Sequence, residues 1–235
     1  MIDSAKYSLN LQFPILVSFI SLRHILHELH EFSHMIVGRF VCGVWGTRDF
    51  NNVHPISERC VASLPAHSLL GLEGPLTNYL LMWIGVWVIR TSKSVRQLSW
   101  GLVLIFATLP FARLFTAIVG GGDEFGVARA MMDDIPAARI ITICAVLLII
   151  GYPVYTAYSV LPQKHRLYYF FGFLLIPMIV EGLVVLGFFN YLLRLNILNE
   201  VWVMGAPQLV AIVLMVSALI FIASFRYVGR LIGFR

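Results

Sequence analysis

Charged residues are scarce in this sequence. Asp, Glu, Lys and Arg make up 12% of its 235 residues, about half of the roughly 25% that an ordinary soluble domain contains. Hydrophobic residues make up 59%, and the mean hydropathy is +0.85. This composition excludes a soluble globular domain and predicts an integral membrane protein.

Cysteine is also scarce, and other common signals are missing. The three cysteines are widely spaced and form no C-x-x-C pair, so we expect free thiols rather than a disulfide framework or a cysteine zinc site. The alternating pattern of barrel strands is absent. Asp3 and Lys6 precede an apolar stretch that has no small-residue cleavage site, so we expect no removable signal peptide.

The apolar runs are long enough for helices that cross a hydrocarbon core, each of which takes about 20 residues. They predict an all-α fold, a polytopic helical membrane protein with about six transmembrane helices in one integral membrane domain, 1–235. The expected spans are about 12–43, 66–89, 98–119, 136–160, 167–193 and 202–225. The segment Trp45–Pro65 reads as a loop or a small hairpin at the membrane surface.

Basic residues gather on one side of this six-span trace. Nine of them, against Asp3 alone, fall on the side of the termini: Lys6, Arg90, Lys93, Arg96, Lys164, Arg166, Arg226, Arg230 and Arg235. An excess of Lys and Arg marks the cytosolic side of a membrane, so the termini are predicted inside. Because these charges follow the ends of apolar segments, the net charge of +5 indicates membrane topology and no nucleic-acid partner.

The first predicted span carries the pentapeptide His30-Glu31-Phe32-Ser33-His34, an H-E-x-x-H motif. Two histidines four residues apart lie on one face of a helix and suit two corners of a tetrahedral zinc site, with Glu31 beside them as a general base. Ionisable groups inside a span are costly unless they face the bundle interior or a ligand. The alternative is an interfacial helix end with solvated histidines.

The same span contains four more polar side chains, Arg23, His24, His27 and Glu28. His27 lies one turn before Glu31 and could belong to the metal shell or hydrogen-bond around it. Glu181 stands in the middle of the fifth span and needs a partner, so we expect it to pair with Arg23.

Two later motifs follow in order along the chain. Gly74-Pro75-Leu76-Thr77-Asn78 opens the second span, and a glycine-rich stretch containing Asp123 and Glu124 follows the third. The Asn78 amide could hydrogen-bond an extended substrate strand, or it could form an interhelical hydrogen bond. Asp133 and Asp134 precede Ile135-Pro136 and are typical of a helix N-terminus.

An H-E-x-x-H helix followed by G-P-x-x-N and then by a glycine-flanked aspartate resembles the site-2 protease family of intramembrane zinc metalloproteases. The resemblance covers residues 24–130, a three-helix catalytic-like core, and leaves 136–225 as additional transmembrane helices. It implies Zn²⁺ on His30, His34 and Asp123, Glu31 as the general base that acts on a zinc-activated water, and substrate handling by Asn78. The implied substrate is a peptide bond in or near a transmembrane segment of a partner protein.

The third metal ligand departs from the family pattern, because Glu124 stands where the family has glycine. Asp123 is the closer match, Glu124 is the alternative, and His54 and His67 are fallback ligands. The family also places the catalytic end of this helix toward the cytosol, whereas the charge distribution places it outside.

Three other functions use some of the same residues. A membrane metallohydrolase could cleave a lipid amide or ester with the same zinc and base. A metal or haem carrier could use His24, His27, His30 and His34, although haem has no need of the adjacent Glu31 carboxylate. An inactive relative of the proteases could retain the scaffold alone.

Overall fold

The computed structural model of the protein describes residues 7–54 and 71–234. Helices dominate this part of the chain, which is an all-α membrane protein as the composition predicts. Four helical stretches are long and apolar enough to cross a membrane: Val95–Met131, Ile135–Val160, Arg166–Arg194 and Gln208–Val228. The strands form only short two-stranded pairs.

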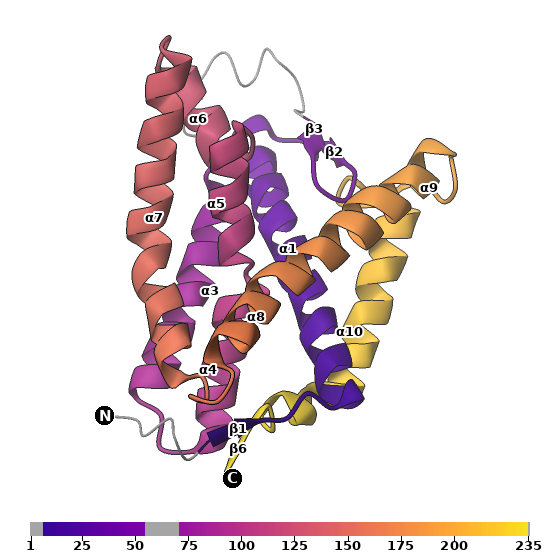
Figure 1. The fold of residues 1–235 in the computed structure, drawn as a ribbon. Helices are drawn as coiled ribbons and strands as arrows, with labels where there is room; N and C mark the ends of the chain where they lie inside the picture. The colour runs from indigo at the N-terminus through magenta and orange to yellow at the C-terminus, as the bar shows by residue number, and fades with distance from the viewer. Residues whose placement is uncertain (1–6, 55–70, 235) are drawn as a thin grey trace.

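The first half of the chain contains β1 (Tyr7–Leu9), α1 (Phe13–Cys42), β2 (Thr47–Arg48), β3 (Val53–His54), α3 (Glu73–Arg90), α4 (Val95–Ala107), α5 (Pro110–Val119) and α6 (Asp123–Met131). The second half contains α7 (Ile135–Val160), α8 (Arg166–Val180), the π-helical segment η3 (Glu181–Phe189), α9 (Asn190–Arg194), β4 (Val201–Val203), β5 (Ala206–Pro207), α10 (Gln208–Val228) and β6 (Ile232–Phe234). α8, η3 and α9 follow one another without a break and form one diagonal rod across the bundle (Figure 1).

Helix ends lie where the local sequence requires them. α1 has Pro14 in its first turn, where a missing N–H does no harm. The helix ends at Cys42 and is capped by Gly43, which has a left-handed φ of 75° and donates its N–H to the Arg39 carbonyl oxygen. Asp134 caps α7 by accepting the backbone N–H of Ala137 at 3.1 Å. The expected spans 12–43 and 136–160 therefore agree closely with α1 and α7.

The expected third span, 98–119, is interrupted. α4 ends at Ala107, and α5 begins at Pro110 after Leu109 adopts a φ of 49°. Proline has no N–H to continue the helical ladder and disfavours the α conformation in the residue before it. The break allows α5 to take its own direction toward α6.

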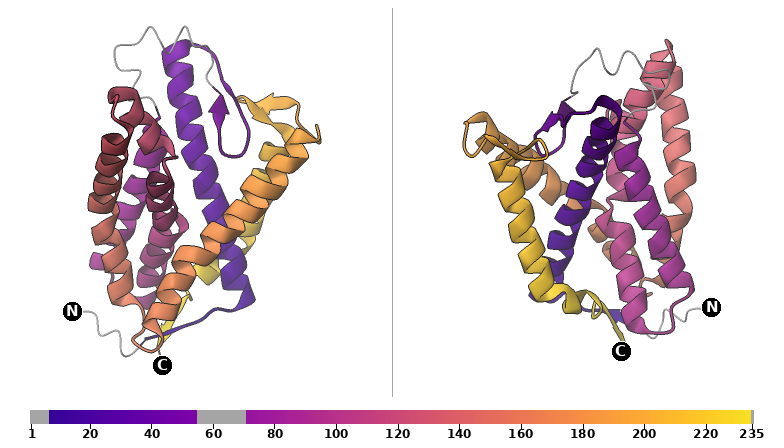
Figure 2. Two further views of the ribbon diagram at one scale, coloured as in Figure 1. Left: turned by 45° about the horizontal axis from the view of Figure 1, so that its top comes forward. Right: turned by 180° about the vertical axis from the view of Figure 1, so that it is seen from behind.

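The rods run alternately up and down, and both described ends of the chain lie at the same end of the bundle (Figures 1 and 2). There β1 pairs antiparallel with β6, with Leu9 opposite Ile232. α3 and α4 pack closely because Gly85 and Gly101 face each other. A Cβ built on either one would lie within 3 Å of the other's carbonyl oxygen, so small residues permit this approach.

The β2–β3 hairpin lies against the upper half of α1, near α9 (Figure 1). The side chain of Phe50 at its tip is fully buried, and its backbone N–H donates to Asn190 Oδ1 at 3.1 Å. Arg48 forms a buried ion pair with Glu28 of α1. The hairpin therefore connects α1 to the C-terminal helices, and the segment that read as a loop or small hairpin begins as a hairpin.

A buried ion pair joins α1 to η3. Arg23 Nη2 lies 3.2 Å from Glu181 Oε1, and both side chains are less than 10% exposed, which confirms the expected pairing. Glu181 is the first residue of η3, and such wide helical segments are rare and often occur at functional sites. We did not predict this segment from the sequence.

We expected the cysteines to be free thiols, and this prediction is wrong for Cys42. Cys42, the last residue of α1, is disulfide-bonded, whereas Cys144 on α7 is a free, exposed thiol. Disulfides persist in oxidising compartments and are rare in the cytosol.

Candidate metal centre

The two motif histidines project from the same side of α1. His30 and His34 are four residues apart, so their rings lie one turn from each other, with centroids separated by 5.0 Å. The His30 side chain is 3% exposed and that of His34 is 11% exposed. Both imidazoles are thus largely removed from solvent.

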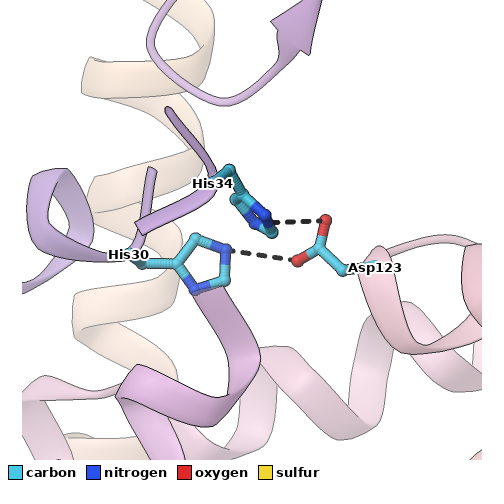
Figure 3. A group of neighbouring side chains, drawn as sticks. All are labelled: His30, His34 and Asp123. Carbon is cyan, nitrogen blue, oxygen red and sulfur yellow. Dashed lines mark ion pairs between the residues drawn. The ribbon is translucent and has the colours of Figure 1, made fainter. Parts of the chain in front are cut away.

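Asp123 meets these histidines from α6. It is the first residue of that helix and follows Gly122, whose φ of 80° turns the chain into it. Asp123 Oδ2 lies 3.2 Å from His30 Nε2, and Oδ1 lies 3.9 Å from His34 Nε2. Figure 3 shows the carboxylate pointing at both rings.

The spacing of these donors suits a small cation. One ligand atom from each of His30, His34 and Asp123 can be chosen so that all lie within 4.8 Å of one another. Ligands at about 2.0–2.2 Å from a tetrahedral zinc ion are about 3.3–3.5 Å apart. The 3.2 Å separation lies close to that value and the 3.9 Å separation is longer, and the two end on different oxygens of Asp123. A bound ion would therefore need side-chain adjustment to contact all three residues.

Gly74, the first residue of the G-P-x-x-N motif, explains how α3 fits against this cluster. A Cβ at Gly74 would lie 2.4 Å from His34 Nε2 and 2.6 Å from His30 Nε2. Real Cβ atoms essentially never approach within 3.0 Å of such neighbours. The motif therefore needs glycine at this position because the two imidazole donors occupy the space of a side chain.

The remaining ring nitrogens of both histidines contact α3. His34 Nδ1 lies 3.0 Å from Glu73 Oε2, and this carboxylate also accepts the Gly71 N–H at 2.7 Å. The Asn78 amide lies 3.1 Å from His30 Nδ1. An Nδ1–H that donates to an oxygen leaves Nε2 as a lone-pair donor, so Glu73 and Asn78 can fix the tautomers that metal binding requires. For Asn78 this needs its amide oxygen turned toward the ring.

Asn78 agrees with one of the two sequence-based alternatives, whereas the contact made by Glu73 was not predicted. Asn78 is only 7% exposed and is bonded to His30, an interhelical hydrogen bond, which was one of the two alternatives for this amide. Glu73 lies at hydrogen-bond distance from His34 Nδ1. The available signal was that a ligating histidine usually donates its second N–H to a carboxylate.

Glu31 lies beside the donor cluster on α1. Its carboxylate Oε1 is 3.9 Å from His30 Nε2, and the residue is 4% exposed. This position suits a group that accepts and returns a proton next to the histidines.

Glu124, the alternative third ligand, is held away from the histidines. Its Oε1 accepts the Tyr79 hydroxyl at 2.6 Å, and its Oε2 lies 3.4 Å from Arg113. Arg113 also contacts Asp123 Oδ2 at 2.9 Å. Glu124 is thus part of a network that fixes Arg113 and, through it, the Asp123 carboxylate.

The other predicted site residues lie elsewhere. His27 does not join the donor cluster, because its Nε2 is 2.6 Å from the Phe50 carbonyl oxygen and its Nδ1 is 3.4 Å from Glu181. His24 is buried about one turn before His27 in α1, farther from the donor cluster. The fallback ligand His67 and the side chain of His54 lie outside the described residues.

No family model, no curated protein and no solved structure matches the chain. The case for its function therefore depends on the three motifs and on the geometry of the residues that they contain.

Proposed function

We propose that this protein is an intramembrane zinc metalloprotease that hydrolyses a peptide bond in or near a transmembrane segment of a partner protein. The observation that carries the proposal is the convergence of His30, His34 and Asp123 within 4.8 Å beside the buried Glu31. These residues come from two separate motifs, nearly 90 positions apart in the sequence.

The donor set favours zinc over other common cations. Two imidazole nitrogens and one carboxylate oxygen match the ligands of catalytic zinc sites, which keep a fourth position open. Calcium and magnesium prefer all-oxygen shells. Zinc, when bound, lowers the pKa of water toward about 7 and polarises carbonyl groups.

The protein's own residues supply proton transfer and orientation. Glu31 lies close enough to the donors to take a proton from an attacking water and to return it to the amine leaving group. Glu73 and Asn78 hold the two rings, and Arg113 holds the Asp123 carboxylate. The helices around the histidines exclude bulk water, which strengthens these electrostatic contacts.

The cluster is accessible from the α6 side. The Asp123 side chain is 32% exposed, whereas those of His30 and Glu31 are 3% and 6% exposed. A substrate carbonyl would thus approach past Asp123. Because helical carbonyls are hydrogen-bonded, the substrate must be locally unwound before its carbonyl can reach the site.

We further propose a multi-pass topology with six crossings and an extracytosolic active site. The basic ends of the helices and the described chain ends lie together, opposite the hairpin and α6 (Figure 1). The positive-inside rule then places the donor cluster toward the outer side. The disulfide at Cys42 supports the same orientation.

The direct test combines metal analysis with proteolysis of a membrane-embedded substrate. We expect about one zinc per chain in the purified protein and cleavage within a reconstituted single-span substrate, mapped by mass spectrometry. Glu31→Gln should keep the zinc and lose cleavage. Glu200→Gln is the matched control, because Glu200 lies far from the donors, just before β4, and its carboxylate accepts a hydrogen bond from the Gln208 amide.

Each result separates the proposal from its competitors. Protein without zinc, or full cleavage by Glu31→Gln, contradicts the proposal. Zinc binding without cleavage of any membrane substrate indicates the inactive relative. A visible absorbance band would indicate haem, which the geometry does not favour because His27 is bonded to the Phe50 carbonyl.

A further inference from the structure

Two neighbouring cavities lie at the end of the bundle opposite the metal centre. The first has a volume of about 440 Å³ and surrounds the turn between α7 and α8. Its walls are polar and aromatic: Tyr158, Gln163, His165, Arg166, Leu167 and Tyr168. The second, of about 220 Å³, is an apolar groove between α1 and α8.

Tyr168 lines both cavities, so the apolar groove and the polar cavity adjoin at this residue. The groove follows α8 from Tyr168 to Val180 and is closed on its other side by Phe19 and Ile20 of α1. The twelve helical steps from Tyr168 to Val180 correspond to about 18 Å. That length suits an acyl chain lying along the helix.

The polar cavity is rich in hydrogen-bond donors for an anion. Arg166, Gln163, His165 and two tyrosines line it, and these side chains carry N–H and O–H groups. Arg166 Nε donates to the Leu161 carbonyl oxygen at 3.0 Å, and its guanidinium lies over the Tyr158 ring, so this cation is held at the cavity wall. Arg166, Leu167 and Tyr168 are also the first three residues of α8, so the positive end of this helix faces the cavity.

The surrounding end of the molecule reinforces this preference. Among the described residues, seven basic side chains and no acidic one lie at or beside the helix ends there (Figure 1). They are Arg90, Lys93, Arg96, Lys164, Arg166, Arg226 and Arg230. By the positive-inside rule this end faces the cytosolic leaflet, where anionic lipids concentrate.

We propose that these two cavities form one binding site for an anionic phospholipid. The phosphate-bearing headgroup occupies the polar cavity at the α7–α8 turn, and one acyl chain occupies the apolar groove between α1 and α8. The site is separate from the metal centre, so it stands or falls independently of the proposed proteolysis.

The lipid chemistry can be tested on the full chain reconstituted in nanodiscs of equal phosphatidylglycerol and phosphatidylcholine with identical acyl chains. After mild detergent extraction, the retained lipids are counted by mass spectrometry. A basic residue near an anionic lipid surface is worth about a five-fold preference. We expect retained phosphatidylglycerol to exceed phosphatidylcholine by at least about five-fold.

The headgroup contacts are tested by charge removal. Lys164→Gln combined with Arg166→Gln should lower the preference for phosphatidylglycerol by about five-fold or more. The pair Lys93→Gln and Arg226→Gln removes the same charge from the same end without touching either cavity, so it should lower the preference clearly less than the first pair does, because only the nonspecific surface attraction is reduced. Equal retention of both lipids by the wild type, or equal effects of the two pairs, overturns the headgroup site.

The groove is tested by filling it. A Cβ at Gly172 would meet only Ile176 Cδ1, at 3.9 Å, so Gly172→Leu extends into the groove without a backbone clash. It should reduce retention of both lipids, whereas Gly151→Leu on α7, where a Cβ meets nothing within 4 Å, should not. Unchanged retention in Gly172→Leu contradicts an acyl-chain groove. A loss of self-association in Gly172→Leu with unchanged lipid would indicate instead that a second copy of the chain covers the groove.

Discussion

Replacing Gly74 by alanine adds one methyl group at the point where α3 meets the metal-binding histidines. That carbon would lie 2.4 Å from His34 Nε2 and 2.6 Å from His30 Nε2. To restore even the 3.0 Å limit of real contacts, the His34 donor must move by about 0.6 Å. Metal–ligand distances tolerate only about 0.2 Å.

We therefore expect Gly74→Ala to weaken zinc binding by at least about ten-fold, the lower end of the range for disturbing groups around a metal ligand. Competition against a zinc-selective chelator measures the affinity, with the protein in detergent. Alanine favours helices over glycine by about 0.5–1 kcal/mol, so helix loss cannot account for the result.

Gly126→Ala on α6 is the matched control, because a Cβ there meets nothing within 4 Å. It should bind zinc as the wild type does. If Gly74→Ala also retains wild-type affinity, then His30 and His34 do not present their Nε2 atoms to a metal beside Gly74, and the proposed geometry is wrong.

Three further predictions concern other contacts. Asp123→Asn should lose most zinc affinity while Glu124→Gln keeps most of it, because only Asp123 faces both histidines; equal losses in the chelator competition would contradict this. Glu181→Ala should lower thermal stability strongly, by about 3–5 kcal/mol for a buried charge left unpaired, and adding Arg23→Ala should recover part of it. Additive losses in this double-mutant cycle would indicate that the ion pair is not coupled. Reporter fusions after Lys93 and at the C-terminus should both report the cytosol, and two external reports would reverse the proposed orientation.

The sequence predicted the main rods because each long apolar run must form a helix to satisfy its backbone in lipid. It could not predict the π-helical segment η3. Nothing in the run Glu181–Phe189 distinguishes it locally from α-helix, and its first residue is held by Arg23 from another helix. The break at Leu109 was visible in principle, since Pro110 follows it.

The donor cluster was predictable to the extent that local spacing determines it. His30 and His34 follow from helix periodicity, and Asp123 follows from the resemblance. The choice between Asp123 and Glu124 depended on which carboxylate Tyr79 and Arg113 engage. The roles of Glu73 and Asn78 depended on how α3 packs against α1, which periodicity alone does not specify.

The pairing of β1 with β6 also constrains how the protein is made. Tyr7–Leu9 emerges from the ribosome early, yet its partner Ile232–Phe234 follows more than 200 residues later. At about 5–20 residues per second, the first strand waits roughly 10–45 s for its partner. The pairing therefore forms only after α10 has been synthesised, and it then joins the two strands at the basic end of the bundle.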